Sequence, residues 1–228
     1  MRQPMLSISH GAASEDAAHD AAMWANQPHW LELLSDGLTL DLSGLAPGPA
    51  AAFPQFLHRF DLPTLPKAAD HEVLILRPGP HLVDGGKSMP VLRAMLALGC
   101  DMVRQLPDLL AVGWTPAASA IGRRFFESAT TAWLEGGPFP ALGLTAFAET
   151  SDGALESVGL AFWIGQELRI EPPLSHDRVS ATRLGIRLIN HLVIIGGLEG
   201  DDRIVAPDGT RLVLRPSRSR ALISVWRE

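Results

Sequence analysis

Residues 84–88, Asp-Gly-Gly-Lys-Ser, are the part of the sequence whose residue types most resemble a phosphate-binding loop. Such a loop offers backbone N–H groups, a lysine that reaches the phosphates and a hydroxyl that contacts magnesium. The Gly-Lys-Ser run follows an apolar segment at 72–76 and precedes a helix that Ser88 could cap. His81 stands where the leading glycine should be, and Pro78 and Pro80 remove N–H donors. We therefore expect a loop and a helix N-cap.

An anion site at the start of this helix is the alternative interpretation. Free N–H groups and the helix dipole favour negative charge at a helix N-terminus. The site would consist of Gly86, Lys87 and Ser88, with the Lys87 ammonium as its charge.

A basic row on the longest predicted helix is the second candidate site. Arg183, Arg187 and His191 follow one another at intervals of four residues. Like charges at this spacing destabilise an isolated helix by about 0.2–0.5 kcal/mol per pair, so something should compensate them. We expect pairing with Glu167 or Glu171 of the preceding strand; solvent, a bound anion or an acidic partner is the alternative.

The sequence indicates no metal site, no cofactor and no identifiable catalytic residue. None of the eight histidines stands in a paired metal-ligand spacing, and no Gly-x-Ser-x-Gly elbow is present. Cys100, the single cysteine, lies among Leu98 and Met102, which predicts a small buried side chain. Whether the protein is an enzyme stays open at this stage.

Composition favours a soluble protein in a bacterial cytoplasm. The formal charge of -6 argues against a nucleic-acid-binding protein, whose surface is basic. The most apolar window, residues 184–198, contains Arg187 and is too short to cross a bilayer. A single cysteine and the lack of an apolar run after Met1 favour the cytoplasm. Arginine far outnumbers lysine, which is typical of GC-rich bacterial genes. We expect no nucleic acid and no membrane as partners.

Residues 158–197 are predicted to form the centre of the core. Val158–Ile164 is an almost unbroken apolar run, and residues 166–170 continue it with alternation, so both predict strand. Pro172-Pro173 ends the extended segment because proline has no N–H to donate to a sheet. Ser175 or Asp177 then caps a helix that runs to Gly196-Gly197.

Other patterns predict elements on both sides of this centre. They are an edge strand at 38–42, a helix at 50–60, strands at 72–76 and 109–114, a helix from Ser88, a helix from Thr115 to Gly136, a strand at 141–150, a hairpin around 207–209 and a strand at 221–226. Residues 62–66 read as a linker. We expect an N-terminal segment, 1–66, partly ordered and packed on a main domain, 67–228. The fold class is α+β, with a mixed, largely antiparallel sheet, helices mainly on one face and a split βαβ-like order with an inserted helix.

The order of landmarks over about residues 70–225 resembles the bacterial family called domain of unknown function 4261. In chain order these landmarks are the Pro-Val-Leu-Arg-Ala helix at 90–94, the strand ending at 111–114, the paired phenylalanines at 125–126, the strands between Gly159 and Leu168, Glu171-Pro172, the helix with Asn190, and Arg215-Pro216-Ser217. The resemblance implies a bacterial α+β protein without an established activity and assigns no site residues.

These observations favour a non-catalytic domain that binds a partner protein, a second copy of itself or a small ligand. The alternative is an enzyme or binding protein for a phosphate-bearing or other anionic small molecule that uses the loop Gly85–Ser88. A third possibility, a piece of a larger assembly, predicts an exposed apolar patch around Trp24 and Trp30.

Overall fold

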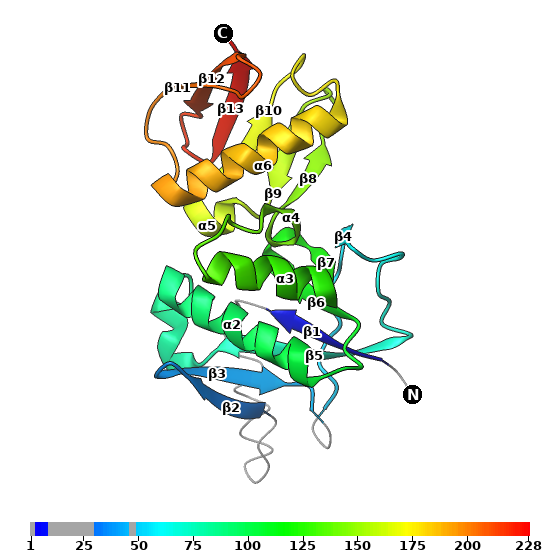
Figure 1. Cartoon of the computed structure of the whole chain (residues 1–228). Coiled ribbons are helices and arrows are strands. Elements are labelled where there is room, and N and C mark those ends of the chain that lie inside the picture. The colour runs from blue at the N-terminus through cyan, green and yellow to red at the C-terminus, as the bar shows by residue number, and fades with distance from the viewer. Residues whose placement is uncertain (1–2, 9–29, 46–48) are drawn as a thin grey trace. The chain divides into compact units, whose positions relative to one another are not determined.

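The computed structural model describes residues 3–8, 30–45 and 49–228 and divides into two compact units, 1–137 and 138–228 (Figure 1). The division differs from the predicted boundary at residues 66/67. Strand β3 (Leu38–Ser43) pairs with β5 (His71–Pro78), and β4 (His58–Phe60) pairs with β7 (Ser119–Gly122). Sheet hydrogen bonds therefore join the two sides of the predicted boundary into one unit. Trp24 lies outside the described residues.

The first unit contains a seven-stranded mixed sheet in the order β2-β3-β5-β1-β6-β7-β4. The remaining strands are β1 (Gln3–Ile8), β2 (Trp30–Ser35) and β6 (Ala111–Trp114). Strand β3 was expected at an edge, but β2 pairs with it on its outer side and forms the edge instead. Helices α2 (Met89–Gln105) and α3 (Arg123–Leu134) contact each other and the sheet, and short 3₁₀ turns precede α2 and β7 at Pro80–Gly85 and Thr115–Ala117.

The helix predicted at 50–60 is wrong, and the one predicted from Thr115 to Gly136 is wrong in part. Residues 51–57 form no helix, because Pro54 lacks the N–H that a helix interior needs. Phe53 and Phe56 nevertheless pack against the buried cluster of Val73, Ile75 and Ala111. The helix expected from Thr115 to Gly136 is divided into the 3₁₀ turn, β7 and α3.

The second unit contains a six-stranded sheet in the order β11-β12-β13-β10-β9-β8. Its strands are β8 (Ala146–Glu149), β9 (Leu155–Val158), β10 (Glu167–Ile170), β11 (Asp202–Val205), β12 (Arg211–Pro216) and β13 (Leu222–Arg227). Two antiparallel three-stranded meanders meet at the parallel pair β10–β13. Helix α6 (Arg178–Ile195) connects the meanders. Two short helical turns, α4 (Ala141–Leu144) and α5 (Ala161–Ile164), contact this helix.

Helix α6 has the boundaries that its caps predict. The Asp177 side chain accepts a hydrogen bond from the Val179 N–H at 3.1 Å, and Gly196 ends the helix with φ of 81°. The buried face of α6 packs against the sheet. It consists of Ala181, Gly185, Leu188, Ile189 and Leu192. A Cβ atom at Gly185 would lie 2.6 Å from Cζ of Phe147 on β8, so the glycine permits this close approach.

The strand predicted at Val158–Ile164 is wrong beyond Val158. Gly159 adopts φ of 88° and residues 161–164 form one helical turn. The Glu167 carboxylate accepts hydrogen bonds from the N–H groups of Gly159, Leu160 and Ala161 at 2.8, 3.1 and 3.0 Å. These bonds satisfy backbone donors that a sheet would otherwise satisfy. The strand predicted at 141–150 likewise begins with α4 and becomes β8 only at residue 146.

The α+β class with mixed, largely antiparallel pairing is confirmed, and the strands form two sheets where one was expected. The hairpin around Pro207-Asp208-Gly209 and the final strand are confirmed as well. Among the helices within the described ranges, none is both long enough and apolar enough to cross a membrane.

Glu167→Ala should destabilise the second unit, because it leaves three partly buried N–H groups without their acceptor. We expect a loss of about 1–3 kcal/mol in the free energy of unfolding, measured by urea denaturation. Glu199→Ala is the matched control, since this glutamate is exposed and should change stability by less than about 0.5 kcal/mol. Equal effects of the two substitutions would contradict this role of Glu167.

Candidate functional site

The predicted site residues belong to different units. Gly86, Lys87 and Ser88 lie in the first unit, between the Pro80–Gly85 turn and α2. Ser88 is the N-cap residue of α2, as predicted, but its hydroxyl makes no capping hydrogen bond. Arg183, Arg187 and His191 lie on α6 of the second unit.

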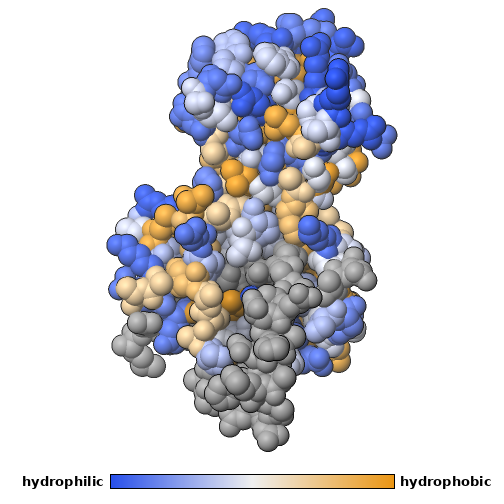
Figure 2. Space-filling view, turned by 180° about the vertical axis from the view of Figure 1, so that it is seen from behind, coloured by the Kyte–Doolittle hydropathy of each residue, from blue (hydrophilic) through white to orange (hydrophobic). Residues whose placement is uncertain are grey.

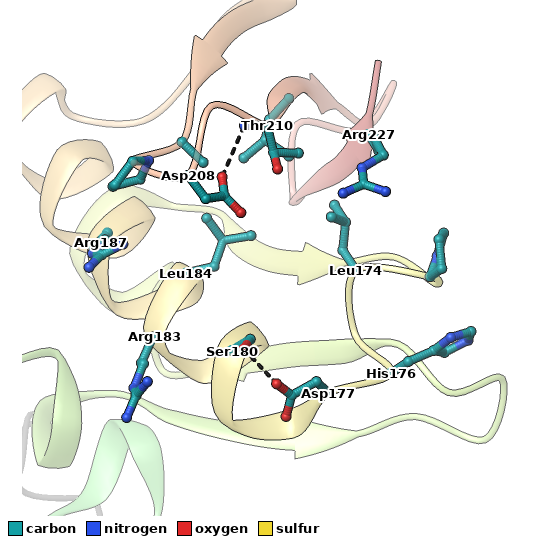
Figure 3. Close-up of a pocket in the computed structure, with 14 residues that line it drawn as sticks. Leu174, His176, Asp177, Ser180, Arg183, Leu184, Arg187, Asp208, Thr210 and Arg227 are labelled. Atoms are coloured by element: carbon teal, nitrogen blue, oxygen red, sulfur yellow. Dashed lines mark hydrogen bonds between the residues drawn. The ribbon is translucent and has the colours of Figure 1, made fainter.

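The second unit has a groove of about 500 Å³ beside the first half of α6 (Figure 3). One wall is the helix itself, and the opposite wall is the β11–β12 turn at 206–210 with the end of β13. The loop at 173–177 closes one end. Leu174, Leu184 and Leu212 line its apolar part. A volume of this size falls within the roughly 300–1,000 Å³ typical of small-molecule sites.

Three arginines line this groove. Arg183 and Arg187 lie one turn apart on the flank of α6, and Arg227 comes from β13. In Figure 3, Arg187 lies beside Leu184 and Arg227 lies close to Leu174, whereas Arg183 projects away from Asp208. The guanidinium groups of the three form no hydrogen bond or ion pair with any residue in the described ranges. The groove therefore presents guanidinium groups that are available to a ligand.

The expected pairing of Arg183, Arg187 and His191 with Glu167 or Glu171 is wrong. Glu167 caps the 159–161 backbone, and Glu171 accepts hydrogen bonds from Arg169 at 2.9 Å and from the Ser224 hydroxyl at 3.0 Å. Both carboxylates are satisfied on or beside β10 and are unavailable to α6. These two glutamates therefore do not offset the charges of the basic row.

The groove also contains two carboxylates, Asp177 and Asp208. Hydrogen bonds from the Ser180 hydroxyl at 2.5 Å and the Val179 N–H lower the pKa of Asp177, and the charge of Arg183 adds to this effect. The N–H and hydroxyl of Thr210 lower the pKa of Asp208, with a smaller contribution from Arg227. Both carboxyl groups are therefore ionised at neutral pH.

His191 lies outside the groove lining. Its Nε2 is 4.0 Å from Oδ2 of Asp202, so this end of the basic row has a carboxylate neighbour. Asn190 donates a hydrogen bond to the Ile186 carbonyl at 2.9 Å. The three basic residues of the predicted row thus do not form one site, and only Arg183 and Arg187 line the groove.

Metal and thiol chemistry gain no support from the described part of the chain. No group of three or more His, Cys, Asp or Glu residues there is arranged to hold a metal ion. Cys100 is buried, as predicted, and burial raises the pKa of its thiol, which disfavours the nucleophilic thiolate.

Hydrophilic residues dominate the surface of the second unit on the face shown in Figure 2. Its exposed large apolar side chains include Val205 on β11 and Ile194 near the end of α6. Scattered exposed apolar residues are normal on protein surfaces.

No protein-family model matches the sequence, and neither the curated proteins nor the solved structures provided a match. The resemblance to domain of unknown function 4261 therefore stays a prediction.

Sequence reasoning missed Arg227 and Asp208 as groove residues. The sequence placed Asp208 in the hairpin turn at 207–209, and Arg227 lay just outside the strand expected at 221–226. The register that aligns Leu212 with Arg227 brings the end of β13 beside the turn. The hairpin pattern at 207–209, followed by a strand expected at 221–226, was the sequence signal that could have indicated their proximity.

Thr210→Val should raise the pKa of Asp208 toward its ordinary value, because it removes the hydroxyl that stabilises the carboxylate. The measurement is a pH titration of the side-chain carboxyl ¹³C shift. Asp177 is the internal control, since its partners are Ser180 and Val179 and its titration should not move. An unchanged Asp208 titration would contradict the role of Thr210.

Proposed function

We propose that the second unit is a non-catalytic binding domain whose groove holds the anionic group of a small ligand. The observation that supports this is the presence of Arg183, Arg187 and Arg227 in one groove, with guanidinium groups that have no hydrogen-bonded partner among the described residues. A guanidinium group offers a planar fork of donors that matches a carboxylate or a phosphate.

Arg187 is the principal residue of the proposal. The charge of Arg183 acts on Asp177, and the charge of Arg227 acts on Asp208, so each has a carboxylate in its neighbourhood. Arg187 forms no ion pair with a described residue, and it lies one turn from the like charge of Arg183. An anion beside Arg187 would offset that repulsion.

The expected affinity is modest. Hydrogen bonds to charged groups contribute about 1.5–3 kcal/mol each, and immobilising the ligand opposes part of this gain. Two such bonds correspond to dissociation constants on the order of millimolar, and contact with the leucines would strengthen binding.

The alternative use of the loop Gly85–Ser88 has less support. The Ser88 N–H donates to the Gly85 carbonyl at 2.8 Å, so this donor is engaged within the loop. Pro90 in the first turn of α2 removes a further N–H. A bacterial cytoplasmic origin, membership of the family named above and a protein partner or second copy stay predictions of the sequence.

The test is a titration of the ¹⁵N-labelled full-length protein with inorganic phosphate and with acetate, observed at the arginine Nε–Hε resonances. We expect a saturable shift of the Arg187 resonance in the millimolar range with at least one of the two anions. Arg187→Ala should weaken binding about tenfold, which is about 1.4 kcal/mol.

Arg218→Ala is the matched control, because Arg218 is exposed and lies outside the groove lining. It should leave the affinity unchanged. Shifts that are equal at Arg187 and Arg218, or that never saturate, would indicate general screening by salt and would contradict the proposal.

A further inference from the structure

The groove contains acidic and basic side chains, and the turn that carries Asp208 is already formed without a ligand. Asp208 belongs to a tight turn in which the Gly209 N–H donates to the Ala206 carbonyl at 2.9 Å and the Ala206 N–H donates to the Thr210 carbonyl at 2.8 Å. Its Oδ1 accepts the Thr210 N–H at 2.9 Å. The Asp208 carboxylate is therefore held in place without a ligand, which reduces the entropic cost of binding.

The close-up of the groove places these charges around an apolar centre. In Figure 3 the Asp208 carboxylate points toward the space above Leu184, with Arg187 on one side and Leu174 and Arg227 on the other. A ligand lying on the leucines would thus meet a negative group and a positive group at the same time.

We propose that the ligand is a zwitterion of the amino-acid or dipeptide class. This inference rests on the proposed function. The ammonium group of the ligand contacts Asp208, its carboxylate contacts Arg187, and an apolar side chain packs on Leu184 and Leu174.

Charge discrimination supports this class over a phosphate monoester. A phosphate dianion in the groove would lie near the ionised Asp177 and Asp208. Repulsion between these like charges would weaken the binding of a phosphate monoester. A zwitterion leaves neither Asp208 nor Arg187 without a counter-charge. The volume of about 500 Å³ also leaves room for two residues.

The experiment compares three probes by calorimetric or NMR titration of the full-length protein. The probes are leucyl-leucine, its N-acetyl derivative, which lacks the ammonium group, and its C-terminal amide, which lacks the carboxylate. We expect leucyl-leucine to bind about tenfold more tightly than either blocked form.

Asp208→Asn is the decisive variant, because the amide oxygen of asparagine still accepts the Thr210 N–H and preserves the turn. It should reduce the preference for leucyl-leucine over the N-acetyl form to about twofold or less. Asp201→Asn is the control, since Asp201 pairs with Arg215 at 3.3 Å and does not line the groove. It should keep the full preference.

The outcomes separate this inference from the proposal on which it rests. The N-acetyl form could bind as tightly as leucyl-leucine, with Arg187→Ala weakening the binding of both. In that case the ligand is not a zwitterion, but the proposal that the groove binds an anion is supported. If the amide binds as tightly as leucyl-leucine and Arg187→Ala has no effect, both are wrong. If none of the probes binds while phosphate or acetate shifts Arg187, the zwitterion alone is overturned.

Discussion

The close packing of Gly185 in α6 against the Phe147 ring in β8 is the constraint on which the groove depends. A larger side chain at Gly185 would overlap Cζ of that ring, so the helix reaches this depth only with glycine there. With Gly185, Ile189 and Leu192 turned to the sheet, α6 has one rotational setting. Arg187, two residues from Ile189, then lies on the exposed flank. The position of the groove cations is therefore a consequence of apolar packing.

The second unit satisfies its more buried charges internally. Arg169 on β10 pairs with Asp152, Glu156 and Glu171, and Glu167 receives backbone N–H groups beside it. Burial makes an unpaired charge costly, so these groups need partners within the fold. Exposed charges carry no such requirement. Arg187 is exposed and therefore needs no partner within the fold, while the charges of β10 stabilise the sheet that supports α6.

Local signals in the sequence predicted local structure well. Asp177 and Gly196 mark the ends of α6, and Pro207-Asp208-Gly209 marks a hairpin, because each residue type favours a specific backbone geometry. The apolar run after Val158 was misleading, since a one-turn helix capped by a distant glutamate has the same composition as a buried strand. Pairing between remote segments, such as β1 with β5 and Leu212 with Arg227, depends on sheet register, which no short window of sequence encodes. Arg183 and Arg187, which the helix spacing pointed to, line the groove, whereas Asp208 and Arg227 on its other side were missed.

The most direct measurement of the central claim is the nuclear Overhauser effect between the Gly185 α protons and the ring protons of Phe147. The packing predicts strong cross-peaks, because the place a Cβ would take at Gly185 is 2.6 Å from Cζ and 2.7 Å from Cε1 of the ring. If these cross-peaks are absent while the Asp177 and Gly196 ends of α6 remain helical, the helix does not have this setting. The groove, with Arg187 on its wall, would then be contradicted.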